Sequence, residues 1–166
     1  MTVIGLDPGT EQSALVTYTG THVASHCIES NAKILEWMRG FSAHRGVLVI
    51  EEFESYGMAV GREVFRTIRW AGNFEAAWFP ARVEFLPRRI IKQHLCHTAR
   101  ATDANIRTEL IDRFGGPQRA VGVKKAPGPL YGIKSHAWAA LAVAVVWHDL
   151  HAHDGELIRS GVQAEF

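Results

Sequence analysis

Two apolar segments, each closed by an acidic residue, constrain the fold of this chain more than any other feature. Val47-Leu48-Val49-Ile50 follows Gly46 and ends at Glu51-Glu52, and a continuous apolar run of this length is typical of a buried parallel strand. Thr2–Leu6 is also apolar and β-rich, and it ends at Asp7-Pro8-Gly9, where proline and glycine favour a turn. The pattern therefore predicts a sheet with a buried centre.

The other segments predict an α/β fold, with a mixed sheet of five strands and helices on both of its faces. In chain order, the expected elements are strands Thr2–Leu6, Ser13–Tyr18 and His22–Glu29, a helix from Ala32 to about Phe41, strand Val47–Ile50, a helix over Arg62–Trp78, strand Val83–Leu86, and helices over Arg88–Cys96, Asp103–Arg113 and Ser135–Leu150. Asn31, Thr102 or Asp103, and Ser135 are the expected helix caps. Gly115–Gly132 is rich in glycine and proline, so we expect a mobile basic loop there. One domain is expected over residues 1–154, followed by a tail at 155–166 that the sequence does not assign.

The composition favours a single globular domain with an uneven charge. Hydrophobic residues make up 47% of the 166 residues and charged residues 21%. No apolar run reaches the roughly 18–20 residues that span a bilayer, and we expect no signal segment. Cys27 and Cys96 match no metal-binding spacing and indicate free thiols in a reducing compartment. The net charge is +1, but Arg82–Lys125 holds ten Lys or Arg against four Asp or Glu, which suits a protein that binds a polyanion.

Asp7 and Glu51 each follow a strand that the pattern places near the centre of the sheet. Sites in open α/β sheets form at the carboxyl ends of strands. Two neighbouring parallel strands would bring the carboxylates together, and such like charges need a cation between them. Mg²⁺ prefers such ligands. Glu51 and Glu52 point to opposite faces of the sheet, and parity alone does not decide which of them serves the site.

The last predicted helix adds a histidine to this edge of the sheet. His136 and Ala139 are three residues apart and share a helix face that continues through Val143 and Val146 toward the sheet. His136 is therefore a candidate to bind metal or to position an attacking water. The alternative is a histidine at a helix start that bonds only to backbone.

These segments together resemble the RuvC class of Holliday-junction resolvases, within the RNase H-like superfamily, and most of all its bacteriophage members. The matching stretches are Ile4-Gly5-Leu6-Asp7-Pro8-Gly9, Val49-Ile50-Glu51-Glu52, Leu86-Pro87-Arg88-Arg89-Ile90-Ile91-Lys92 with Asp103–Phe114, and Ala139-Ala140-Leu141-Ala142-Val143-Ala144. The first motif alone is weak, but the ordered set at these spacings is specific. The resemblance implies an RNase H-like fold over nearly the whole chain.

The resemblance also implies a catalytic site with four positions, at Asp7, Glu51, His136 and Ala139. It selects Glu51 over Glu52, and His is one of the residues the family uses at the third position. The family normally has Asp at the fourth position, so Ala139 is a departure, either an engineered Asp-to-Ala change, which we favour, or a natural loss. Asp7, Glu51 and His136 are the expected metal ligands. The implied cofactor is Mg²⁺, with Mn²⁺ as a substitute, and two ions are expected in the fully acidic form.

By the same resemblance, the chain is a homodimer in the cytoplasm of a bacterium or a phage-infected host, and it resolves four-way junctions or related branched DNA by hydrolysis of phosphodiester bonds. No membrane and no nucleotide cofactor are expected. The helix over Arg62–Trp78 would supply the dimer face through Phe65, Ile68, Trp70 and Phe74, or these side chains belong to the core. The expected DNA contacts are phosphate contacts from Arg88, Arg89, Lys92, Arg100, Arg119, Lys124 and Lys125, and base stacking by Phe53 and Tyr56.

Three other interpretations stay open. Ala139 favours a non-catalytic protein that binds branched DNA. Asp7-Pro8-Gly9-Thr10 fits the phosphate loop of actin-like ATPases, although those proteins need two such domains. The set His148, Asp149, His151, His153 and Asp154 resembles a metal cluster, although histidines are also favourable at a helix C-terminus.

Overall fold

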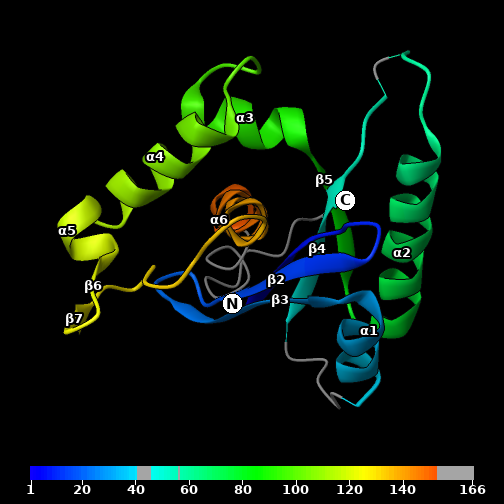
Figure 1. The fold of residues 1–166 in the computed structure, drawn as a ribbon, viewed down its shortest axis with the longest axis horizontal. Coiled ribbons are helices and arrows are strands. Elements are labelled where there is room, and N and C mark those ends of the chain that lie inside the picture. Colours follow the sequence, from blue (N-terminus) through cyan, green and yellow to red (C-terminus); the bar gives the residue numbers. More distant parts are fainter. Residues whose placement is uncertain (41–45, 56, 153–166) are drawn as a thin grey trace, which may run out of the picture.

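A five-stranded sheet with the order β3-β2-β1-β4-β5 forms the centre of the molecule (Figure 1). The computed structural model describes residues 1–40, 46–55 and 57–152. Strands β1 (Val3–Asp7), β2 (Gln12–Tyr18) and β3 (Val23–Ser30) form an antiparallel meander. Strands β4 (Val47–Glu52) and β5 (Val83–Pro87) continue the sheet parallel to β1. The predicted mixed sheet is confirmed.

Helices cover both faces of this sheet, also as predicted (Figure 1). Helices α1 (Asn31–Gly40) and α2 (Arg62–Trp78) pack on one face, and α6 (Ala137–His151) packs on the other. Helices α3 (Arg88–Cys96) and α4 (Asp103–Arg113) lie outside α6 as a further layer. None of the helices in the described residues is long and apolar enough to cross a membrane.

Alternation along the two central parallel strands divides the core into two halves. Ile4, Leu6, Leu48 and Ile50 are buried against α1 and α2. Val3, Val47 and Val49 are buried on the other face, among the side chains of α6. Since strand side chains alternate, Asp7 and Glu51 share the α6 face, and the exposed Glu52 belongs to the opposite one. The structure therefore places Glu51, rather than Glu52, on the same face of the sheet as Asp7.

Helix α6 is buried on almost every side because it lies between the sheet and the outer helices. From Ala137 to Trp147, every residue is buried except Ala139, which is half-buried. The backbone of α6 also comes very close to β1. A Cβ atom at Gly5 would lie 2.1 Å from the Ala140 carbonyl oxygen and 2.9 Å from the Ala144 Cβ atom. Glycine at position 5 is what permits this packing.

Three local predictions differ from the structure. Asn31 begins α1 but its buried side chain accepts a hydrogen bond from the Ser13 hydroxyl and donates one to the Gly9 carbonyl, so it fixes the turn after β1. Helix α6 has no side-chain cap, and Ser135 adopts a left-handed φ of 46° two residues before it. Residues 115–132 contain the short helix α5 (Pro117–Ala120) and a hairpin of β6 (Gly122–Val123) and β7 (Ala126–Pro127). Buried Ala120 and Leu130 tie this segment to the core, which its glycine and proline content did not reveal.

Two predictions fall partly or wholly outside the described residues. The tail at 155–166 and the domain boundary at residue 154 lie there, as do His153 and Asp154 of the candidate terminal metal cluster. The described members of that cluster are used differently. Asp149 accepts hydrogen bonds from His94 and Arg113, and the His151 ring bonds to the Trp147 carbonyl.

Candidate active site

Asp7 and Glu51 meet at the carboxyl ends of neighbouring parallel strands. Leu6 of β1 pairs with Ile50 of β4, so the next residue of each strand is an acid on the α6 face. Both side chains are largely buried, with 16% of Asp7 and 11% of Glu51 exposed. The two carboxylates that the sequence predicted to converge therefore do so in the structure.

The pKa of Asp7 is raised by burial and in part by the nearby carboxylate of Glu51. Burial, and then the charge of Glu51, raise the pKa of Asp7 from 3.8 to about 6, although His136 and Arg88 act in the opposite direction. A second carboxylate beside the buried Asp7 carboxyl makes a pair of acids that favours a bound cation. Strong perturbation of this kind is common where proteins bind cations or carry out catalysis.

His136 stands at the start of α6, over the end of β1. Its Nδ1 lies 3.0 Å from Asp7 Oδ2, while 73% of its side chain is exposed. An ionised Asp7 accepts from Nδ1–H, which leaves Nε2 of the exposed ring as an acceptor toward solvent. His136 therefore lies over the strand ends, where the sequence placed it, and its hydrogen bond with Asp7, which the sequence did not predict, holds the orientation of the ring.

Ala139 lies one turn into the same helix and lines a cavity of about 480 Å³ together with Asp7, Arg88, Asp103 and His136. Its methyl group offers no ligand. A fourth acid at position 139 would project into this cavity, so the departure noted in the sequence falls inside the site.

Arg88 is the main difference from the sequence-based description of the site. The first residue of α3 follows directly on β5, and its guanidinium forms ion pairs with both Glu51 and Asp103. From the sequence, Arg88 was expected to contact phosphate, and Asp103 was expected only as a possible helix cap and not as part of the site. The sequence contained part of this information, because Arg88 directly follows β5, which runs parallel to β4 and β1, and both of those strands end in acids.

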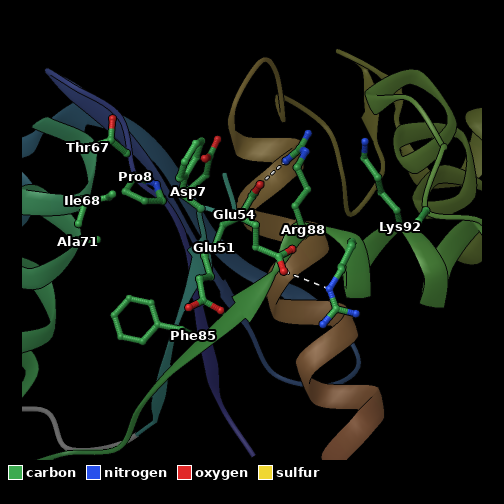
Figure 2. A pocket seen from close by; sticks show the side chains of 14 residues that line it. Asp7, Pro8, Glu51, Glu54, Thr67, Ile68, Ala71, Phe85, Arg88 and Lys92 are labelled. Atoms are coloured by element: carbon green, nitrogen blue, oxygen red, sulfur yellow. Dashed lines mark hydrogen bonds and ion pairs between the residues drawn. The ribbon is translucent and has the colours of Figure 1, made fainter. Parts of the chain in front are cut away.

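A larger cavity of about 650 Å³ opens from the two acids between α2 and α3, with Thr67 and Ile68 on one wall and Arg88 and Lys92 on the other (Figure 2). The exposed ring of Phe53 also lines it. Arg89 lies on the same wall and donates from Nε to Glu54 at 3.1 Å. Basic and aromatic side chains that were predicted to contact DNA therefore gather around the carboxylates.

The other predicted DNA contacts lie elsewhere. Arg100 is exposed in the connection between α3 and α4, and Arg119 is exposed on α5. Lys124 and Lys125 form the exposed turn between β6 and β7, at the far end of the outer helical layer (Figure 1). Tyr56 lies outside the described residues. A cation that sequence analysis missed is Arg107, whose guanidinium sits 5.1 Å from the ring centre of Trp138, beside His136.

The donor set fits one hard cation rather than two. Asp7 and Glu51 supply carboxylate oxygens, and Glu51 Oε2 is buried with no hydrogen-bond partner among the described residues. However, among residues 1–40, 46–55 and 57–152, no three His, Cys, Asp or Glu side chains lie close enough together to hold a metal ion. With Ala139 in place, two carboxylates with water ligands could hold a single Mg²⁺, and the two-ion arrangement lacks its further acid.

Comparison with known proteins agrees with this geometry at the level of the fold. No protein-family description and no curated protein sequence matches the chain. Among solved structures, Thermus thermophilus RuvC is similar with a TM-score of 0.65 and 20% identity, over 93% of this chain and 97% of that one. T. thermophilus RuvC in complex with a Holliday junction substrate is similar with a TM-score of 0.62 and 19% identity, over 93% and 96%. The chain therefore has a RuvC-like α/β fold.

Proposed function

We propose that this chain is a structure-selective DNA endonuclease that resolves four-way junctions and related branched DNA, in a form disabled by Ala139. The observation that carries the proposal is the convergence of Asp7, Glu51 and His136 at one sheet edge, with position 139 beside them. The RuvC-like fold supports it, since one similar structure is a complex with a Holliday junction.

Each residue of the site is proposed to have a separate role in phosphodiester hydrolysis. Asp7 and Glu51 would hold Mg²⁺, which supplies charge neutralisation for the phosphate oxygens and activation of water. Asp7 also fixes His136 through Nδ1, so that Nε2 can orient a water molecule or take its proton. In hydrolysis, a water oxygen forms a new bond to phosphorus while the bond to the leaving sugar oxygen breaks, and that oxygen receives a proton.

Ala139 removes one ligand from this arrangement. On the proposal it replaces an aspartate, whose carboxylate would share the cavity with Asp7 and His136. Its loss leaves a protein that binds DNA and cleaves it poorly or not at all. A non-catalytic junction-binding protein is the second candidate, favoured by the same alanine and by the ion pair that already occupies Glu51.

The decisive experiment compares Ala139→Asp with the parent on a labelled four-way junction in Mg²⁺. Paired nicks by the Ala139→Asp protein, and binding without nicks by the parent, are expected. His136→Ala in the Ala139→Asp background should abolish the nicks and so tie them to this site. Binding by both proteins with cleavage by neither would favour the non-catalytic candidate.

DNA binding is proposed to involve Phe53, Tyr56, the half-buried Lys92 and the exposed cations Arg89, Arg100, Arg119, Lys124 and Lys125. Lys124 and Lys125 provide a test of the phosphate assignment because they share one hairpin turn. Replacing both with alanine should lower the salt slope of junction binding by roughly 1.8, since each phosphate contact contributes about 0.9. An unchanged slope in a salt titration would remove the hairpin from the DNA interface.

The dimer is proposed to form through α2, because Phe65 and Ile68 are 59% and 48% exposed. Of the four residues considered from the sequence, Phe74 is instead fully buried in the core, and Trp70 is half-buried against it. Phe65→Glu is therefore expected to convert a dimer into a monomer in sedimentation experiments, while the exposed α2 change Glu75→Gln should not. A parent protein that sediments as a monomer would contradict the assignment.

A further inference from the structure

Arg88 places a positive charge inside the site where a metal ion would be needed. One nitrogen of its guanidinium pairs with Glu51 Oε1, and the other pairs with Asp103 Oδ1. The two acids come from different elements, the end of β4 and the start of α4, and Arg88 bridges them from the start of α3. Its side chain is 32% exposed, so it is held within the site rather than extended into solvent.

The site is short of positive charge even with Arg88 present. Arg88 uses only one oxygen of Glu51, and Oε2 of the same carboxylate remains buried without a partner among the described residues. An unsatisfied buried carboxylate oxygen is costly. A small cation between Asp7 and Glu51 would satisfy it, but a guanidinium hydrogen-bonded to Oε1 sets up electrostatic repulsion against that cation.

Asp103 is the residue that holds Arg88 in this position. It is mostly exposed, and it lines the cavity of Asp7, His136 and Ala139. Asp103 also starts α4, which Thr102 caps through a reciprocal bond with Asn105, so its backbone is well fixed. Ala139 contributes no charge to this cavity. After Glu51, Asp103 is therefore the second acid that holds Arg88 in place.

We propose that Arg88 is a built-in counter-ion of the carboxylate site, anchored by Asp103, and that it competes with a divalent cation for Glu51. The inference deepens the proposed function and rests on it only for the identity of the site. It assigns Arg88 and Asp103 as positioning residues that set the metal affinity of the site.

The test is a titration of DNA-free protein with Mn²⁺, in which the free ion is measured by electron paramagnetic resonance. Arg88→Gln keeps a polar side chain, although a shorter one, and removes its charge. It should bind Mn²⁺ at least about tenfold more tightly than the parent, which corresponds to removal of one nearby repulsive charge at the dielectric of a half-buried site. Equal or weaker binding would overturn the proposal, as would a failure of both proteins to bind Mn²⁺.

Asp103→Asn distinguishes two roles for Asp103, an anchor of Arg88 or a ligand of the metal ion. If Asp103 anchors Arg88, its loss releases the guanidinium, and Mn²⁺ should bind roughly two- to fivefold more tightly, a smaller gain than for Arg88→Gln. Weaker binding would show that Asp103 is itself a ligand and would overturn its assigned role. Asp103→Asn also keeps the proposal open to refutation if Arg88→Gln does not fold.

Arg82→Gln is the matched control. Arg82 lies at the opposite end of β5 from Arg88 and pairs with Glu84, so its replacement removes the same charge far from the site. It should leave Mn²⁺ affinity unchanged, and a gain equal to that of Arg88→Gln would mean that only the net charge matters. Junction binding by the parent in EDTA, measured in parallel, tests the proposed function independently of every Mn²⁺ affinity.

Discussion

Asp7 of β1 lies beside the start of α6, and Asp149 lies in the last turn of that helix. Each is hydrogen-bonded to a histidine, but their environments differ. At the start of the helix, Asp7 accepts one hydrogen bond from His136 and lies beside Glu51. In the last turn, Asp149 accepts from His94 and from both terminal nitrogens of Arg113. The same residue types therefore build one site that is short of cations and one that is saturated with hydrogen bonds.

The pKa values of the two aspartates move in opposite directions. Burial and Glu51 raise the pKa of Asp7 to about 6. Burial also acts to raise the pKa of Asp149, but hydrogen bonds from Arg113 and His94 outweigh it and hold the value below 3.8. Asp149 joins α6 to α3 and α4, whereas Asp7 is kept in an unfavourable setting. This contrast teaches that ion pairing alone does not mark a functional site, and that an unsatisfied carboxylate is the more informative feature.

The largest expected effect is on stability at the saturated site. Asp149→Asn leaves Arg113 without its carboxylate and should lower the free energy of unfolding by about 2–3 kcal/mol, because a largely buried acid with three charge-assisted bonds is lost. Urea denaturation at pH 7 measures this. Asp112→Asn, on the exposed side of α4, is the control and should change the value by less than about 0.5 kcal/mol.

The matching substitution at the other site should have the opposite sign. Asp7→Asn removes a charge that burial and Glu51 disfavour, while a carboxamide still accepts from His136. The free energy of unfolding at pH 7 should rise by about 1–2 kcal/mol, less than the full shift of Asp7 would give because neighbouring groups relax. A loss of stability like that of Asp149→Asn would erase the distinction between the two sites.

The pH dependence sharpens the same comparison. A carboxyl whose folded pKa is raised contributes most to stability below its unfolded value of 3.8, and this contribution is lost as the pH rises to about 6. The advantage of Asp7→Asn should therefore vanish near pH 4 and develop fully above pH 6. Asp149, with its lowered pKa, contributes above 3.8 and loses its contribution only as the pH falls further. Urea denaturation of the parent, Asp7→Asn and Asp149→Asn from about pH 2 to about pH 7.5 resolves the two windows.

The smallest expected effect is on DNA affinity. Asp7→Asn removes a negative charge from the cavity that is proposed to receive phosphate, so junction binding in EDTA at low salt should tighten by roughly two- to fivefold. Asp149→Asn, far along α6, should not change it. Gel mobility shifts at matched temperature, where all variants are folded, provide the measurement, and equal tightening by both substitutions would contradict the placement of DNA at Asp7.

The sequence predicted the fold well because short stretches of residues determine most of its strands and helices. The apolar runs ending at Asp7 and Glu51 defined two central strands, and helices α2 and α3 have the predicted bounds. Residues 115–132 were harder, because Ala120 and Leu130 become ordered through contacts with distant parts of the core. Asn31 looked like a cap and instead bonds to Ser13 and Gly9, a choice that depends on how α1 meets the sheet.

The candidate site was predictable in its acids but not in its counter-ion. Strand ends bring Asp7 and Glu51 together by register alone. The direction of Arg88 depends on how α3 leaves β5 and where α4 places Asp103, and neither follows from periodicity. The spacing of His148, Asp149 and His151 suggested a metal cluster. Instead, His148 packs against Tyr18, His151 bonds to the Trp147 carbonyl, and Asp149 meets partners from α3 and α4.

Gly5 carries a consequence for anyone who redesigns this protein or transfers its site to another scaffold. It has no functional group, yet the distance from β1 to α6, and so from Asp7 to His136, depends on the absence of its side chain. Any other residue at position 5 would separate strand and helix one turn below the site and pull the histidine from the acid without altering either. A transplanted site therefore needs this glycine as much as it needs the carboxylates, and a search for relatives that keep the site should require it beside Asp7.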